Sequence, residues 1–532
     1  MKLLTFVFAL FLVTPAAGTE FLVRVADAAL TSELASRVTE RFDGWSLAVV
    51  DEADLDRLVA DGVNFEVLDA EPRGKAYTWV MPSAGVALED LEPHGTILFS
   101  GDDGVLMRTT QQGILGLNRM QVELAGIGTV PLPVSRVLPS TPRAAEVPDS
   151  LILELVGRVS ADSLEAVHRR LIDFRTRYST TDSCNRAMEW TRDRFIEYNC
   201  DSTVLDSFLT EYAPNAIGVK LGVVNPQRIY VVCGHVDATS EVQFVYTPGS
   251  DDNASGAATV LEACRVFADV EFENSVYFIG FAGEEQGLVG SDSFARKAQL
   301  RGDSILLAMN FDMVSYGREG LDTIVIYGAN ASPPSVEFVD FFRAQADTFS
   351  ALKHIADIEN VPERRSDHYS FWKYGFPFLR GGYYDRTPEY HTTGDTIGPP
   401  YFRYCGTNNF PMQAEMVKAL VAVIAKLGGV QPAVGVCGGG RGIPTARALA
   451  ARPSVGTAPV RVMLSRRPEP GSKLEVVDAA GRLVRVLATR GEPIVAWDGR
   501  DASGLKASPG VYFLRLPTSG ITHAARVVLL GK

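Results

Sequence analysis

Two apolar segments with a helical pattern between them constrain the fold of this 532-residue chain more than any other feature. The segments are RIYVVCGHVD (228–237) and SVYFIGFAGEE (275–285), and GAATVLEACRVFAD (256–269) lies between them. Continuous apolar runs rich in β-branched residues are typical of strands buried on both faces. The strand–helix–strand order predicts an α/β domain whose sheet carries helices on its faces, with polar side chains at the strand ends.

We place this α/β unit at 150–430. The segments before and after it differ from it in composition and are predicted to form separate parts of the chain. Residues 19–145 alternate short strand-like and helix-like pieces, as an α+β module would, and end in a proline-rich stretch. Residues 431–457 are rich in Gly, Ala and Pro and predict a linker. Residues 458–532 consist of short strand patterns separated by Gly-containing turns and predict a β-sandwich of immunoglobulin type.

The first 18 residues predict a secretory signal peptide. One lysine precedes an apolar run from Leu3 to Val13, and small residues lead to an expected cleavage after Gly18. The run is too short to span a bilayer, and no other segment approaches the roughly 20 apolar residues that a membrane helix needs. We therefore expect an exported protein, secreted or at the cell surface, without a stable membrane span.

Charge and cysteine content exclude two further classes. The net charge of −13 repels phosphate backbones and argues against nucleic acid as a partner. The six cysteines lack CxxC spacing and are too few for a disulfide-built scaffold. Cys184 and Cys200 flank a predicted helix about 20 Å long, so no bridge between them is expected.

Five short polar segments at or near strand ends carry the candidate chemistry. They are GHVD (234–237), SDDNASG (250–256), GEEQGLVGS (283–291), NFDM (310–313) and YHTTGDT (390–396). Taken singly, each has a structural explanation, such as a helix N-cap or a solvated helix start. Together they supply two imidazoles and several carboxylates without thiolate, a set that suits zinc, cobalt or manganese. A carboxylate can bridge two metals, so the cluster predicts a two-metal hydrolytic site.

In this order, the five segments closely resemble the secreted zinc-dependent aminopeptidase family that includes bacterial leucine aminopeptidases, with glutamate carboxypeptidase II and glutaminyl cyclase as relatives. The resemblance covers about 170–430 and implies a mixed central sheet between helix layers. It also implies two Zn²⁺ ions and a set of ligands. His235 and Asp312 would hold one ion, Glu285 and His391 the other, and Asp252 would bridge them.

The same resemblance assigns roles beside the metals. Glu284 would be the general base that takes a proton from water and passes it to the departing amine. Asp237 would orient His235, and Asp251 would support or cap the turn in which the Asp252–Asn253 peptide bond is often cis. Tyr390 or Tyr384 would donate a hydrogen bond to the oxyanion, although a packed ring with a satisfied hydroxyl explains either tyrosine equally well.

Other polar residues receive structural interpretations. Asp367 and His368 are expected to support the pocket without binding metal, and the adjacent Arg364 and Arg365 read as a solvated pair. Surface positions are expected for the histidines at 94, 168, 354 and 523.

The leading hypothesis is an exported di-zinc aminopeptidase acting on peptide substrates. A carboxypeptidase is an alternative that needs a cationic pocket, for which Arg364, Arg365 and Arg380 are candidates. Cyclase chemistry and a non-catalytic binding module on a peptidase scaffold are less favoured, since that cyclase branch uses one zinc and every ligand position here is filled.

The two flanking modules have separate hypotheses. The N-terminal module fits a pro-segment that assists folding or blocks the cleft, or a permanent accessory domain. The C-terminal module resembles the Ig-like domain of the flagellar hook-capping protein and the sorting modules of secreted enzymes, with Trp497 in its core. Contact with export machinery or the cell surface is expected of it, and anchoring, sorting and stabilisation are alternative roles.

Overall fold

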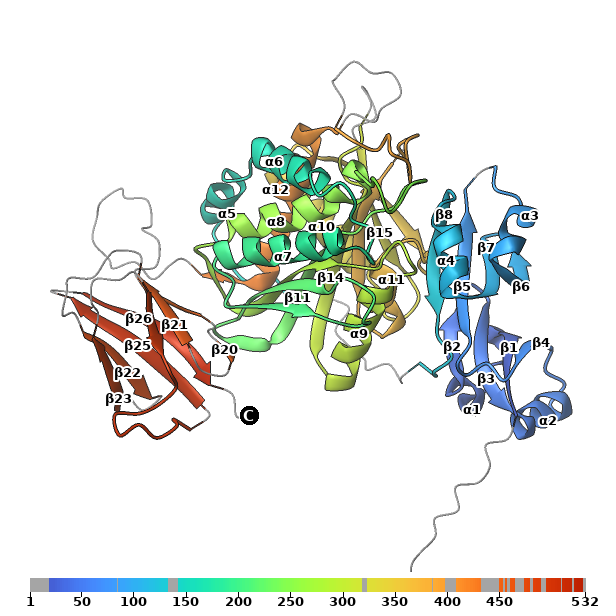
Figure 1. Ribbon diagram of the computed structural model, residues 1–532, viewed down its shortest axis with the longest axis horizontal. Helices are drawn as coiled ribbons and strands as arrows, with labels where there is room; N and C mark the ends of the chain where they lie inside the picture. The colour runs from blue at the N-terminus through green and yellow to red at the C-terminus, as the bar shows by residue number, and fades with distance from the viewer. Residues whose placement is uncertain are drawn as a thin grey trace, which may run out of the picture.

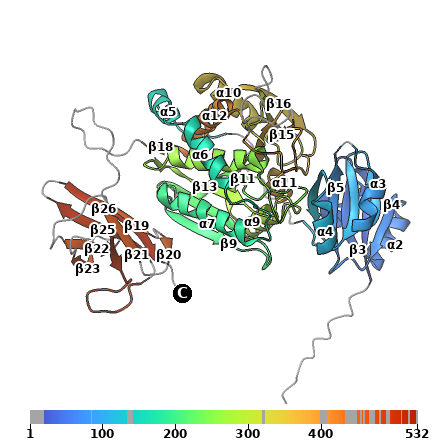
Figure 2. The same cartoon turned by 45° about the horizontal axis from the view of Figure 1, so that its top comes forward.

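The computed structural model divides the chain into an N-terminal module, a central α/β domain and a C-terminal sandwich (Figure 1). The two views place the module and the sandwich on opposite sides of the central domain (Figures 1 and 2). The structure describes residues 19–83, 85–132, 142–317, 323–384, 386–397 and 408–431, together with 449–452, 455–456, 460–464, 473–478, 482–488, 494–508, 510–518 and 521–529. The signal peptide and most of the predicted linker lie outside these residues.

The N-terminal module contains two four-stranded antiparallel sheets with the same strand order, β2-β3-β1-β4 and β6-β7-β5-β8. Each sheet comes from a strand–helix–strand–strand–helix–strand unit, the order of the ferredoxin-like motif. The elements of the first unit are β1 (Glu20–Ala26), α1 (Ser32–Ala35), β2 (Val38–Arg41), β3 (Trp45–Asp51), α2 (Glu52–Ala60) and β4 (Phe65–Ala70). Those of the second are β5 (Ala76–Pro82), α3 (Leu88–Leu91), β6 (Gly95–Gly101), β7 (Gly104–Thr109), α4 (Gln111–Leu117) and β8 (Val122–Ile127). The predicted α+β module is therefore a tandem repeat, which the sequence did not reveal.

The central domain is built on an eight-stranded mixed sheet of order β16-β15-β17-β14-β11-β13-β10-β9. Strands β17, β14, β11 and β13 are parallel neighbours, while β10 and β15 run antiparallel to β13 and β17. The strands are β9 (Ser202–Asp206), β10 (Asn215–Lys220), β11 (Asn225–His235), β13 (Asn274–Phe281), β14 (Ser304–Asp312), β15 (Thr323–Ala329), β16 (Lys353–Glu359) and β17 (Phe378–Tyr383). The two apolar segments of the sequence are β11 and β13, so the predicted sheet is confirmed.

Helices cover both faces of this sheet. The larger core lies under α5 (Asp149–Val156), α6 (Ala161–Ile172), α7 (Asp182–Glu197), α8 (Ser255–Val266), α10 (Val336–Phe349) and α12 (Phe410–Gly428). The opposite face packs on α9 (Val289–Arg301) and α11 (His368–Lys373). Side chains of β11 alternate between the two cores, with Val232 on the first and Val231 on the second. A two-stranded ladder of β12 (Glu271–Phe272) and β18 (Val430–Gln431) follows α12.

The C-terminal part has a three-stranded and a five-stranded sheet around a core that includes buried Trp497, as predicted. The strands are β19 (Leu449–Arg452), β20 (Val455–Gly456), β21 (Val460–Leu464), β22 (Lys473–Asp478), β23 (Leu483–Ala488), β24 (Ile494–Trp497), β25 (Gly510–Thr518) and β26 (Ile521–Leu529). Because β19 and β20 pair with β21 and β26, this part starts before the predicted boundary at residue 458. Their short, Ala- and Gly-containing sequences gave no strand signal.

The fold bears on the predictions about membrane-spanning helices and about a disulfide between Cys184 and Cys200. Among the described residues, no helix combines the length and apolar character needed to cross a membrane. Cys184 is a buried free thiol, and Cys200 at the far end of α7 faces Cys264 instead, with 3.5 Å between the two Sγ atoms.

The N-terminal module packs against the central domain through a shared apolar cluster. Phe42 and Trp79 of the module lie in one cluster with Leu288, Tyr369 and Trp372 of the central domain. Beside it, the buried Lys373 ammonium forms ion pairs with Glu40 of the module and with Asp292. The backbone N–H of Gly126 in β8 donates to the carbonyl of Gly287 over 3.0 Å. The strand β8 is thereby fixed next to the segment that carries Glu284 and Glu285.

Candidate metal centre

Parallel strands bring three of the predicted segments to one edge of the sheet. His235 is the last residue of β11 and Asp312 is the last residue of β14, its parallel neighbour. Glu284 and Glu285 follow the end of β13, on the other side of β11. The His235 Nε2 atom lies 3.5 Å from Asp312 Oδ1 and 3.8 Å from Glu284 Oε2. The predicted convergence of these side chains is thus observed.

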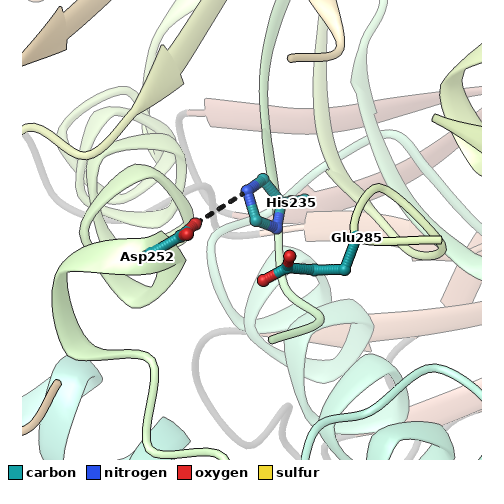
Figure 3. Close-up of side chains that lie close together, drawn as sticks. All are labelled: His235, Asp252 and Glu285. Atoms are coloured by element: carbon teal, nitrogen blue, oxygen red, sulfur yellow. Dashed lines mark ion pairs between the residues drawn. The ribbon is translucent and has the colours of Figure 1, made fainter. Parts of the chain in front are cut away.

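Asp252 enters the site from the turn at Ser250–Ala254, directly before α8. Its two oxygens face different histidines: Oδ1 lies 3.4 Å from His235 Nε2, and Oδ2 lies 3.2 Å from His391 Nε2. Figure 3 shows the Asp252 carboxylate directed at the His235 ring, with the Glu285 carboxylate close to the same ring. The Asp252–Asn253 peptide bond is cis, as the resemblance implies. A Cβ at Gly256 would meet the carbonyl oxygen of Phe311 at 2.0 Å, so glycine lets α8 approach β14 this closely.

His391 completes the group from the loop that follows β17. Its Nε2 atom lies 2.9 Å from Glu285 Oε2, and its ring stacks on Tyr390 with centroids 3.7 Å apart. The backbone of His391 has φ 58°, a left-handed conformation that is uncommon for a residue with a Cβ. Such outliers concentrate at functional sites, where the surroundings hold them in place.

Asp237 organises the site without facing the other ligands. The Nδ1 atom of His235 lies 3.1 Å from the Asp237 carbonyl, which leaves Nε2 directed toward Asp252 and Asp312. The Asp237 carboxylate accepts hydrogen bonds from the backbone N–H groups of Glu284 and Glu285, and a third from the Ser179 hydroxyl. A single side chain therefore fixes the segment that carries both glutamates. The contact that orients His235 comes from the main-chain carbonyl of Asp237, whereas the Asp237 Oδ1 atom lies 3.6 Å from Nδ1.

The donor set fits metal ions better than a metal-free cluster. The candidate ligands and Glu284 are each at most 9% exposed, and the Oδ1 atom of Asp312 is buried without a hydrogen-bond partner. Burial raises the pKa of Glu284 well above its usual range and that of Glu285 to about 7, and repulsion between the carboxylates adds to both shifts. Cations would relieve this repulsion. Groups of ligand atoms within 4.8 Å of one another are His235, Asp252 and Glu285, and His235, Glu284 and Asp312.

Several residues that support the centre had no assigned role in the sequence. Asp395, at the end of the YHTTGDT segment, accepts the backbone N–H groups of Asp251 and Asp252, each over 2.9 Å. The fully buried Arg177 donates to the carbonyls of Val236, Pro248 and Gly249, and so joins the two loops that carry His235 and Asp252. The position of Asp395 inside a recognised segment was a usable signal, whereas Arg177 gave none.

The structure tests the predictions for three neighbouring residues. Asp251 supports the turn as predicted, because its Oδ1 accepts from Ser315 and Tyr316. His368 packs on Phe378 and stays outside the ligand groups. The surface position expected for His168 is wrong: its ring is fully buried, 3.2 Å from the Ser250 hydroxyl and 3.1 Å from Gln413.

The solvated pair expected at 364–365 is also wrong. Arg364 is 4% exposed, and its guanidinium lies 3.5 Å from the ring centroid of Phe42. Arg365 is ion-paired with Glu123 of the N-terminal module. Both side chains are covered by the module, whose position the local sequence could not indicate.

The N-terminal module also reaches the candidate ligands. The cavity beside the candidate ligands has a volume of about 20 Å³. It is lined by Glu123 and Leu124 of β8, by Glu284 and Tyr390, and by several of the candidate ligands. Tyr390 donates its hydroxyl to Glu123 over 3.2 Å, whereas Tyr384 is 53% exposed. A single water needs roughly 10–15 Å³, so the cavity has room for about one water.

The chain is similar to known proteins in structure and in sequence. Its fold is similar to that of the LapA aminopeptidase of Legionella pneumophila, with a TM-score of 0.52 at 17% identity over 66% of this chain and 98% of that one. Residues 217–400 match the model of Peptidase family M28, and this range contains every predicted ligand, Asp237 and Glu284.

Curated relatives also match part of the chain. A probable zinc metalloprotease of Pyrenophora teres f. teres is 30% identical over 223 residues, which is 37% of this chain and 46% of the relative. A probable leucine aminopeptidase of Arthroderma otae is 26% identical over 50% of this chain and 76% of the relative. The chain thus spans about half the length of the first of these relatives.

Proposed function

We propose that this protein is an exported di-zinc exopeptidase that removes N-terminal residues from peptides. The observation that carries the proposal is the Asp252 carboxylate, whose two oxygens face His235 and His391 respectively. That orientation suits a carboxylate shared between two metal ions, the arrangement used in two-metal hydrolysis. The match to a peptidase family and the relative named as a probable leucine aminopeptidase add independent support.

The ligands divide between two zinc ions as follows. His235 and Asp312 would hold one ion, and Glu285 and His391 the other, with Asp252 common to both. When bound, zinc supplies Lewis acidity that polarises a carbonyl and lowers the pKa of water. The buried Oδ1 atom of Asp312, which has no hydrogen-bond partner, is consistent with this assignment.

The chain's own residues then perform the proton transfers. Glu284 lines the cavity beside the ligands, where it can accept a proton from the attacking water and deliver it to the departing amine. Tyr390 lies at the same cavity, and its hydroxyl can donate to the developing oxyanion once it is no longer bonded to Glu123. Asp237 and Ser179 hold the Glu284 segment in position.

The N-terminal module is proposed to be a pro-segment that blocks the cleft until it is displaced. Support comes from the small volume of the cavity and from Asn118, which donates to the carbonyl of Glu285 and accepts from Tyr178. These contacts leave little room for a peptide beside the ligands. Export through the N-terminal signal, and a surface or sorting role for the C-terminal module, remain part of the proposal.

The function can be tested on a chain with a site-specific protease sequence placed within 133–141, between the module and the central domain. The protein is folded intact, loaded with zinc, cut and separated from its module. One mixed-sequence peptide and its N-acetylated twin are then followed by mass spectrometry. We expect stepwise loss from the free N-terminus and no cleavage of the acetylated twin. Loss from the C-terminus of both peptides would instead establish a carboxypeptidase, and no cleavage despite bound metal would indicate a binding role.

Zinc content tests the bridging role of Asp252. We expect two zinc ions per chain in the parent protein and one or none in Asp252→Asn, because an amide is a poor bridging ligand. Asp251→Asn is the matched control: it changes the adjacent buried carboxylate but keeps the oxygen that accepts from Ser315 and Tyr316. Elemental analysis after gel filtration gives the stoichiometry. Two ions in Asp252→Asn would contradict the assignment.

A further inference from the structure

Three arginines gather at the cavity beside the candidate metal ligands. Arg365, Arg380 and Arg386 come from the segment before α11, from β17 and from the loop after β17. Arg365 and Arg380 line the cavity itself, and Arg386 is bonded to the Glu123 carboxylate that lines it. Arg380 is 3% exposed, and its Nε atom has no hydrogen-bond partner. This is a concentration of positive charge next to a cluster that otherwise attracts cations.

One carboxylate from the N-terminal module neutralises this group. Glu123 pairs through Oε2 with Arg365, and through Oε1 with Arg386 and the Tyr390 hydroxyl. Its side chain is only 10% exposed, and the two guanidiniums that hold it are 25% exposed. Arg386 is itself held by the Tyr383 hydroxyl over 2.8 Å and packs on the Tyr390 ring. The arrangement is a preformed cradle for a carboxylate, since guanidinium groups bind carboxylates with matched geometry.

We propose that Arg365 and Arg386 form a subsite for a carboxylate of the substrate, and that Glu123 occupies this subsite in the intact chain. The inference rests on the proposed function, including displacement of the module. Once Glu123 leaves, Arg386 loses its carboxylate partner, and Arg365 keeps only the half-exposed Glu363 at 2.8 Å. Guanidiniums left together in a partly buried site repel each other, so binding of a new anion is favoured.

The position of Glu123 limits where the substrate carboxylate can be. Its side chain lines the same small cavity as Asp252, Glu284 and His391. A carboxylate bound there therefore lies close to the peptide bond that is cut. Two kinds of substrate carboxylate can lie this close to the peptide bond that is cut: an acidic side chain on the N-terminal residue, or the terminal carboxylate of a very short peptide.

Matched substrates distinguish these sources on the cut, zinc-loaded protein described above. The first pair is glutamyl-alanine amide and glutaminyl-alanine amide, and the second is leucyl-alanine and leucyl-alanine amide. We expect kcat/KM to favour the carboxylate member of at least one pair by about tenfold or more. Arg365→Gln and Arg386→Gln should each reduce that preference about tenfold. The control is Arg301→Gln, which removes a surface arginine paired with Asp303 and should leave the preference unchanged.

A binding measurement separates this inference from the proposed activity. Glutarate, a dicarboxylate without a peptide bond, is titrated calorimetrically into the cut protein and the three variants. We expect binding that weakens about tenfold in Arg365→Gln and Arg386→Gln but not in Arg301→Gln. Hydrolysis of the neutral peptides without any carboxylate preference or glutarate binding would overturn the subsite and leave the proposed function standing. If no peptide is hydrolysed, the proposed function fails, and the glutarate titration alone decides the subsite.

Discussion

Replacing Glu284 by glutamine should reduce kcat of the cut protein by about 10²- to 10⁴-fold while the protein keeps its zinc. Glutamine has nearly the same size but cannot accept the proton from the attacking water. The Glu284 carboxylate is 3.8 Å from His235 and lies at the cavity where the peptide bond would bind. Because His235 retains Asp252 and Asp312 as close neighbours, the loss of Glu284 should affect proton transfer more than metal binding.

The measurement combines steady-state kinetics with zinc analysis. A loss confined to kcat, with KM and zinc content close to the parent values, assigns Glu284 to the chemical step. Glu241→Gln is the control and should keep the parent kcat. Glu241 is an exposed carboxylate that accepts hydrogen bonds from Thr393, in the loop that carries His391. Full kcat in Glu284→Gln would show that another group is the base. Loss of zinc would instead make Glu284 a ligand, as its grouping with His235 and Asp312 allows.

The sequence predicted those parts of the site that depend on local patterns. Continuous apolar runs identified β11 and β13, and the carboxyl ends of parallel neighbours lie at one edge of a sheet. His235 ends β11 and Glu284 follows β13, so strand prediction placed these two side chains at that edge. The pairing of β11 with β14, which brings Asp312 beside His235, came only from the structure. The roles of Asp252 and His391 came from the resemblance to a family, because both lie on loops whose course no local pattern determines.

The parts that sequence analysis missed depend on pairing between distant segments. Glu123 and Arg365 are 242 positions apart. Sequence analysis assigned no role to Glu123, and it placed Arg365 either in a solvated pair or in a cationic pocket, without indicating a partner. His168 is buried because Gln413 of α12 and Ser250 meet its ring from separate elements. The repeat in the N-terminal module was hidden for a related reason: two sheets can share a strand order without sharing side chains.

Separating the N-terminal module from the central domain should raise peptidase activity at least about a hundredfold over the uncut chain. The physical reason is volume: while β8 is in place, the cavity beside the ligands is about 20 Å³, room for about one water, so a peptide must displace β8 to bind there. Activity of the uncut chain then requires the module to lift away. A hundredfold reduction corresponds to about 2.7 kcal/mol in favour of the closed arrangement. Burial of the shared apolar cluster can supply a free energy of that order, and the ion pairs of Lys373 and Glu123 fix the register of the two parts.

The comparison uses the chain with the protease sequence in 133–141, assayed with one neutral peptide before cutting, after cutting and after removal of the module by gel filtration. Adding purified module back should restore inhibition. In the uncut chain, Glu123→Gln should raise activity, because an amide is a weaker partner for Arg365 and Arg386. Glu92→Gln, at an exposed position in the same module, should not change it. Equal rates before and after cutting would mean that the module is a permanent accessory domain and that peptides reach the zinc ligands by another route.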